Sequence, residues 1–137
     1  EDVTGRSLAN GYSQSLGTVF SQEMKPLEVE ILVVQAGINS HPNEIYRISF
    51  DGSIIDEKNV AVIGGRADVV QSFLKENSPS HAPNLDEALR LCVTALDQTA
   101  NQKLQPEGLE VAVLDRNRTG RKFRRLSVSE IRQALPS

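Results

Sequence analysis

Segments with the pattern of β-strands follow one another in blocks along this chain and do not alternate with helices. A first block of four short strands is predicted between residues 27 and 63, and a second block, a hairpin, between residues 109 and 126. Helical patterns precede, separate and follow the two blocks. Strands that are neighbours in the sequence pair antiparallel through short turns, whereas parallel pairing needs a long crossover. The pattern therefore predicts an α+β fold with antiparallel sheets.

The first block is defined most sharply by a turn signal. Residues 44–50 alternate apolar and polar side chains, and the pair Asp51-Gly52 that follows favours a two-residue hairpin turn. A short strand over 53–55 is expected after the turn, and another over 60–63. Residues 27–36 alternate only at their start, which predicts a strand that becomes covered on both faces.

Helical periodicity occurs in four segments. The first runs from Thr4, a suitable N-cap, to Met24, and its glycines would permit close approach of another element. A second helix is expected over 68–76. The third begins at Asn84 and the last at Ser127, each with a glutamate three residues later that completes a capping box. The apolar face of the third helix is predicted to consist of Leu85, Leu89, Cys92 and Leu96.

Charge and composition exclude several classes of partner. The formal net charge of −3 argues against nucleic acid or an anionic membrane as the default partner. No apolar run reaches the roughly 20 residues of a membrane-spanning helix, and no signal-peptide pattern opens the sequence. A single cysteine, Cys92, cannot form an internal disulfide. These features predict a cytoplasmic protein.

No arrangement of residues predicts a catalytic or metal site. His41 and His81 lie in proline-containing loops, and Cys92 falls on an apolar helix face, which predicts a buried, unreactive thiol. Metal motifs such as HExxH or an EF-hand loop do not occur. The carboxylates of Asp56-Glu57 are expected to be solvated, and those of Asp86-Glu87 to favour a helix N-terminus. We predict no catalytic residue, no metal ligand and no cofactor.

Gly64-Gly65-Arg66 joins a strand signal to a helix signal. Free N–H groups at such a junction could hold a phosphate. The segment lacks the spacing of both glycine-rich nucleotide-binding motifs, GxGxxG and GxxxxGK[ST]. The sequence therefore favours a plain tight turn.

The second hairpin carries the main charge cluster of the chain. Its basic residues are Arg116, Arg118, Arg121, Lys122, Arg124 and Arg125. One interpretation is a surface for nucleic acid. The other is a solvated hairpin that pairs with an acidic neighbouring subunit. The negative net charge, and the presence of a single interleaved aromatic residue, Phe123, favour the second interpretation.

Several spaced blocks of residues match one known family in order. The blocks are Asp2-Val3-Thr4-Gly5-Arg6 with Leu8-Ala9-Asn10 and Gly17-Thr18, then Lys25 to Glu30, Ile45 to Ile54, Leu109 to Asp115, and Phe123 to Leu126. They resemble, in turn, the second long helix, the start of the following strand, a strand–turn–strand unit and the last hairpin of bacterial proteasome α-subunits of the actinobacterial type.

The resemblance implies a fold and a domain assignment. Residues 1–137 would be the C-terminal half of a single proteasome-subunit domain, without its N-terminal half. The family fold is a four-layer αββα sandwich of the Ntn-hydrolase type, with two antiparallel sheets between helix layers. The order predicted from the residues agrees with that half: a helix, several strands, two helices, two strands and a helix.

The resemblance also implies a function and a set of partners. The chain would be a non-catalytic structural subunit of the 20S proteasome core, in a heptameric ring with other α-subunits. That ring would stack on the proteolytic ring of β-subunits and control substrate access, and a ring-shaped ATPase activator would deliver unfolded chains. The catalytic β-subunits use an N-terminal threonine, which no residue of this chain matches.

One surface can be assigned from the resemblance, and two other functions stay open. The family's second helix faces the β-ring, so a β-ring interface is expected at Thr4, Leu8 and Tyr12. The first alternative is an Ntn-type hydrolase relative, which would need an exposed N-terminal Thr, Ser or Cys. The second is a small binding module that uses the basic hairpin 116–125 to bind polyanions.

Overall fold

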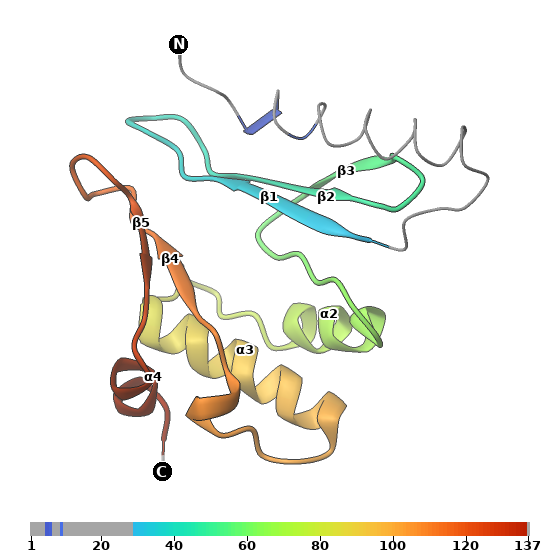
Figure 1. Cartoon of the computed structure of the whole chain (residues 1–137), viewed down its shortest axis with the longest axis vertical. Coiled ribbons are helices and arrows are strands. Elements are labelled where there is room, and N and C mark those ends of the chain that lie inside the picture. The colour runs from blue at the N-terminus through green and yellow to red at the C-terminus, as the bar shows by residue number, and fades with distance from the viewer. Residues whose placement is uncertain (1–4, 7–8, 10–28, 137) are drawn as a thin grey trace. The chain divides into compact units, whose positions relative to one another are not determined.

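A computed structural model of the chain describes residues 5–6, 9 and 29–136 (Figure 1). The chain divides into two compact units, residues 1–65 and 66–137, and each is described by itself. Of the helix expected over residues 4–24, the described residues Gly5, Arg6 and Ala9 are helical. The antiparallel sheets and helices confirm the predicted α+β class. In the described part of the chain, no helix has the length and apolar composition needed to cross a membrane.

The first unit contains a three-stranded antiparallel sheet in the order β1-β2-β3. Its strands are β1 (Ile31–Gln35), β2 (Glu44–Ile48) and β3 (Ile54–Glu57). Ile48 lies opposite both Ile31 and Ile54, so one aliphatic side chain from each strand meets on one face. This register follows from the period of two along a strand, which places alternate residues on the same side.

The turn between β2 and β3 lies where Asp51-Gly52 predicted it, but its loop is longer. Ser49 and Ser53 still pair, because Ser49 N–H donates to the Ser53 carbonyl at 3.0 Å, which leaves residues 50–52 as the loop. Gly52 takes a positive φ of 88°, the left-handed conformation that closes three-residue hairpin loops. Asp51 Oδ1 accepts a hydrogen bond from Ser53 N–H at 3.0 Å. The predicted two-residue loop is therefore wrong by one residue.

The strand predicted over residues 60–63 does not form. These residues have no regular secondary structure and are half-buried. A short apolar run specifies burial but not conformation, and becomes a strand only where an edge is available to pair with. Among the described residues, the sheet of this unit ends at β3.

The core of the first unit lies on one face of the sheet. Val33, Tyr46 and Ile48 are buried there together with Ala9, and Ile31 and Ile54 pack against them. The helical residues approach closely: Gly5 N–H donates to Gln35 Oε1 at 2.6 Å, and a Cβ at Gly5 would lie 2.9 Å from that oxygen. A larger residue at position 5 would require the Gln35 side chain to shift, so glycine favours this close approach to the sheet.

The second unit is built from helices and a hairpin. Its elements are α2 (Ala67–Glu76), α3 (Leu85–Ala100), the 3-10 turn η1 (Pro106–Gly108), β4 (Ala112–Leu114), β5 (Phe123–Arg125) and α4 (Val128–Ala134). Both predicted capping boxes are confirmed. Asn84 and Glu87 close the first turn of α3, and Ser127 and Glu130 close that of α4, each pair through two reciprocal hydrogen bonds.

The buried face of α3 differs from the prediction. Leu89 and Val93 are buried with Ala134 of α4, whereas Leu85 and Leu96 are each 41% exposed and Cys92 is also exposed. Apolar residues lie on two flanks of this helix. The neighbouring elements that pack against the helix determine which flank is buried. Leu109, Val111, Leu126 and Leu135 supply that partner surface.

Ile48 is fully buried at the centre of the first core, which makes a mutational prediction. In the intact protein, Ile48→Ala should lower the free energy of unfolding by about 2–5 kcal/mol, because it removes buried methyl groups and leaves a cavity. Urea denaturation measures the change. The same substitution at Ile38, a loop residue that is 54% exposed, is the matched control and should have an effect of about 0.5 kcal/mol or less. Equal effects at both positions would contradict this core assignment.

Candidate functional site

The described residues do not assemble a nucleophile with a base. His81 Nε2 lies 3.1 Å from Glu87 Oε2, but this exposed pair extends the cap of α3. His41 is exposed in its loop. Burial raises the pKa of the Cys92 thiol, although part of the residue is accessible, so the thiolate is disfavoured at neutral pH. Within the part of the chain that the structure describes, no group of three or more His, Cys, Asp or Glu residues could hold a metal ion.

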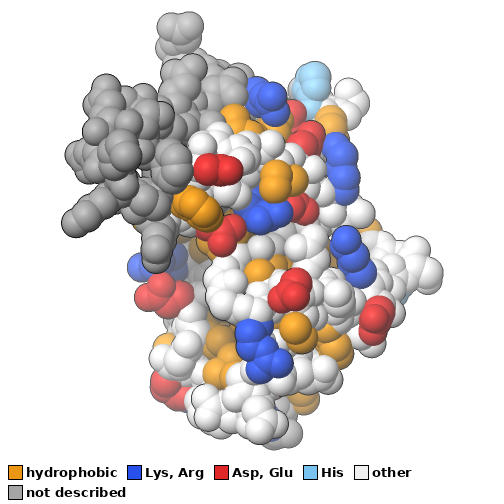
Figure 2. Space-filling view, turned by 90° about the vertical axis from the view of Figure 1, so that its right-hand side faces the viewer, with side chains coloured by type: hydrophobic (Ala, Val, Ile, Leu, Met, Phe, Trp, Pro, Cys, Tyr) orange, Lys and Arg blue, Asp and Glu red, His pale blue; other side chains and the backbone are white. Residues whose placement is uncertain are grey.

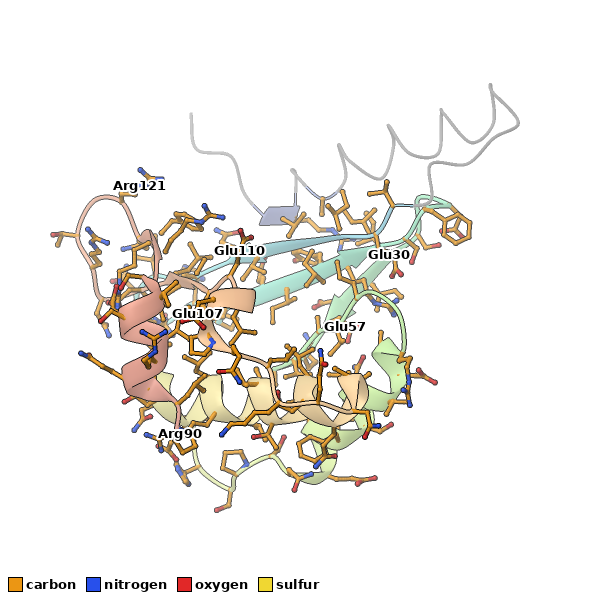
Figure 3. All side chains as sticks on the ribbon, turned by 60° about the horizontal axis from the view of Figure 1, so that its bottom comes forward. Glu30, Glu57, Arg90, Glu107, Glu110 and Arg121 are labelled. Carbon is orange, nitrogen blue, oxygen red and sulfur yellow. The ribbon has the colours of Figure 1, made fainter. Side chains whose placement is uncertain are left out.

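Three charged residues form a ladder across the sheet of the first unit. Arg47 on β2 contacts Glu57 of β3 at 3.2 Å and Glu30, which precedes β1, at 3.4 Å (Figure 3). The Glu57 side chain is only 12% exposed, against 36% for Glu30. The expectation that both carboxylates of Asp56-Glu57 are solvated is therefore wrong for Glu57. Cross-strand pairing positions this carboxylate beside a guanidinium, which explains the partial burial of its charge.

The glycine segment before α2 is a turn, as predicted. Gly64 has φ of +108° and Arg66 has φ of 60°, both in the left-handed region. The Arg66 guanidinium donates to the Thr99 carbonyl at 3.1 Å, near the C-terminal end of α3, where a cation is favoured by the helix dipole. The arginine of this motif thus has a structural role within the second unit.

Several basic side chains of the hairpin contact groups within the second unit. Lys122 Nζ donates to the carbonyls of Arg116 and Arg118, at 3.3 and 2.7 Å, and closes the loop between β4 and β5. Arg124 pairs with Glu130 of α4 at 2.9 Å. Arg125 lies 3.7 Å from Glu110, in a more exposed pair. These contacts favour the interpretation of a solvated hairpin.

The loop of this hairpin projects Arg121, whose guanidinium lies 5.6 Å from the centre of the Phe123 ring (Figure 3). Such a stacked arginine keeps its charge at the surface while its stem covers the ring. Basic and acidic side chains are interspersed on the face of the molecule shown in Figure 2, with hydrophobic side chains between them.

The three residues predicted for a β-ring interface, Thr4, Leu8 and Tyr12, lie outside the described residues. Their described neighbours make defined contacts. Ala9 is fully buried against the sheet, and the Arg6 guanidinium lies 5.3 Å from the centre of the Tyr46 ring. These two described residues therefore contact the sheet of the first unit.

The Arg124–Glu130 pair predicts a specific dependence of stability on pH. Hydrogen bonds from the Ser127 backbone, and then the Arg124 side chain, lower the pKa of Glu130 in the folded protein. A lowered folded-state pKa stabilises the fold at pH values above the ordinary glutamate range, and this contribution is lost as pH falls through the folded pKa. Glu130→Gln should lower the melting temperature at neutral pH, and the difference from wild type should close in acid.

Glu110→Gln is the matched control, because Glu110 also pairs with an arginine of the hairpin but is almost fully solvated. Its melting temperature should follow that of wild type across the same pH series. Differential scanning calorimetry measures both variants. A Glu130→Gln difference that is constant with pH would show that the effect comes from packing and not from the carboxylate charge.

Comparison with known proteins identifies relatives along almost the whole chain. The sequence model of the family described as "Proteasome subunit" matches residues 2–114. The protein named Proteasome subunit alpha from Thermomonospora curvata is 46% identical over 135 residues, which cover 98% of this chain and 58% of that protein. Proteins of the same name from Streptosporangium roseum and Saccharomonospora viridis are 45% and 43% identical, over 98% and 99% of this chain and 52% and 56% of their own lengths. The chain spans about half the length of the curated relatives it matches.

Proposed function

The chain belongs to the proteasome subunit family, and from this membership we propose that it is part of a non-catalytic α-subunit of a 20S proteasome core. The observation that carries the proposal is the 46% identity, over 98% of the chain, to a protein named Proteasome subunit alpha. Identity at this level along a whole chain implies a common fold and a common place in an assembly. The antiparallel sheets and the order of the helices agree with that fold.

In this proposal, residues 1–137 form the C-terminal half of one subunit domain with a four-layer αββα architecture. Two apolar surfaces support it. On the face of the β1–β2–β3 sheet opposite its core, Val34 and Ile55 are 48% and 37% exposed. Leu85 and Leu96 are exposed along α3. Apolar faces of this kind are normally covered by another layer, which the rest of the subunit would supply.

The mechanism we propose is steric. A heptameric ring of α-subunits would stack on the β-ring and narrow the entrance to the proteolytic chamber. Folded proteins would be excluded, and chains unfolded by a ring-shaped ATPase activator would pass. The subunit would contribute surfaces and rigidity and no bond chemistry. We place this assembly in the cytoplasm, with no cofactor, nucleic acid or membrane taking part.

The contacts of the described residues argue against the two alternatives. A hydrolase relative needs a nucleophile beside a base, and the described residues do not bring such a pair together. A polyanion-binding module at residues 116–125 needs available cations. Lys122 and Arg124 are engaged with backbone carbonyls and with Glu130. A structural scaffold needs neither a nucleophile nor available cations, so it is consistent with these contacts.

We assign the β-ring interface to Thr4, Leu8 and Tyr12. Support comes from the neighbouring residues, since Gly5 and Ala9 pack against the sheet of the same unit. These contacts hold Gly5 and Ala9, which lie between the assigned residues in the sequence, close to the sheet.

The assignment predicts an assembly defect. Leu8→Glu in the intact protein, co-produced with the β-subunit of the same organism, should leave α-rings that fail to stack on β-rings, because the charge would be buried in the interface. Native mass spectrometry resolves single rings from stacked rings. Ile38→Glu, in an exposed loop, is the matched control and should stack normally. Stacking of the Leu8 variant at the wild-type level would overturn the interface, and failure of the wild-type protein to form rings would overturn the proposed function.

A further inference from the structure

A cleft opens within the second unit between α3, the loop after it and α4. Its volume is about 460 Å³, and the residues that line it lie between Arg90 and Pro136. Pockets for small ligands and peptide side chains typically measure roughly 300–1,000 Å³. All of the lining residues belong to the second unit.

The floor of the cleft is apolar. Val93 of α3 is buried at its base, and Leu104, Pro106 and Leu135 are half-buried around it. Each aliphatic side chain that enters such a floor gains stability in proportion to the apolar area removed from water, about 25 cal/mol per Å². The floor therefore favours a ligand with an aliphatic part.

The rim of the cleft is cationic. Arg90, Lys103 and Arg132 line it and are exposed to solvent. Arg132 is paired with Glu107, and Arg90 Nε donates to the Ala134 carbonyl at 2.8 Å, which fixes the orientation of its guanidinium (Figure 3). Among the described residues, neither Arg90 nor Lys103 forms an ion pair with a carboxylate.

The acidic residue in the lining has a structural role. Asp97 Oδ1 accepts a hydrogen bond from the Leu104 N–H at 2.7 Å and closes the loop that forms one wall. The Asp97 carboxylate therefore interacts with a backbone N–H group of that loop. The rim retains an excess of positive charge, which a carboxylate complements, and an oriented guanidinium binds carboxylates in a bidentate manner.

We propose that this cleft binds an acidic peptide segment of a partner protein, with aliphatic side chains on the floor and carboxylates at Arg90 and Lys103. The rim is open to solvent at each of its cations, which suits an extended chain that crosses the cleft better than an enclosed small molecule. Its lining residues are distinct from Thr4, Leu8 and Tyr12, and it adds a binding activity to the proposed scaffold function.

Saturation-transfer difference NMR on the intact protein tests the proposal, with the peptide acetyl-Leu-Glu-Leu-Glu-Leu-amide as the probe. Transfer should be strongest to the leucine methyl groups, and the peptide in which glutamine replaces glutamate should bind about tenfold more weakly. Lys103→Gln and Arg90→Gln should each weaken binding of the acidic peptide about three- to tenfold. Lys75→Gln, at an exposed position in the last turn of α2, should leave it unchanged.

Two results would overturn the proposal. The first is the absence of saturation transfer to the acidic peptide. The second is equal binding by the Lys103 variant and the wild type, or by the two peptides, since the carboxylates would then have no role. Arg90 also holds Ala134 through its side chain, so the Lys103 variant decides the outcome if the Arg90 variant unfolds, because among the described residues the Lys103 side chain forms no ion pair.

Discussion

Close packing of helical residues against one face of the β1–β2–β3 sheet organises the first unit. Ile48 receives a neighbour from each adjacent strand, and Ala9 lies over the same face without any exposed surface. At Gly5 the approach is so close that a side chain there would require Gln35 to shift. The proposed α–β contact involves Thr4, Leu8 and Tyr12, which flank these packed residues in the sequence.

The opposite face of the same sheet carries ion pairs between charged side chains, together with aliphatic side chains that are only partly buried. Arg47 bridges Glu30 and Glu57 across three strands, while Val34 and Ile55 remain exposed beside this ladder. An ion ladder fixes the strand register through oriented contacts, and exposed aliphatic neighbours add little to stability until they are covered. In the subunit that we propose, another layer of the domain would cover this face.

Features that depend on residues close together in the sequence were predicted well, whereas features that depend on distant packing partners were not. The capping boxes at Asn84 and Ser127 and the turn at Gly52 depend on residues within a few positions, so the sequence identified them. The buried flank of α3 and the burial of Glu57 depend on distant partners, and both predictions failed. Family membership was predicted correctly because it rests on many spaced blocks together.

The cleft of the second unit had no sequence signal at all. Its cations, Arg90 and Lys103, are separated by part of α3 and by the polar loop that follows it. Hydrogen bonds from the backbone N–H groups of Gln102 and Leu104 to Asp97 close the loop, and Lys103 lies at the rim of the cleft. Periodicity and motif spacing do not encode such a contact.

The central claim is that this sequence is part of an α-ring subunit. It is tested most directly by isolating the native protein from its own cells with an antibody to this sequence and measuring the masses of the protein and its companions. We predict a protein about twice the length of this chain, since the chain covers 52–58% of its relatives, together with a subunit that begins with threonine. A protein of 15.0 kDa without such a companion would contradict the assignment.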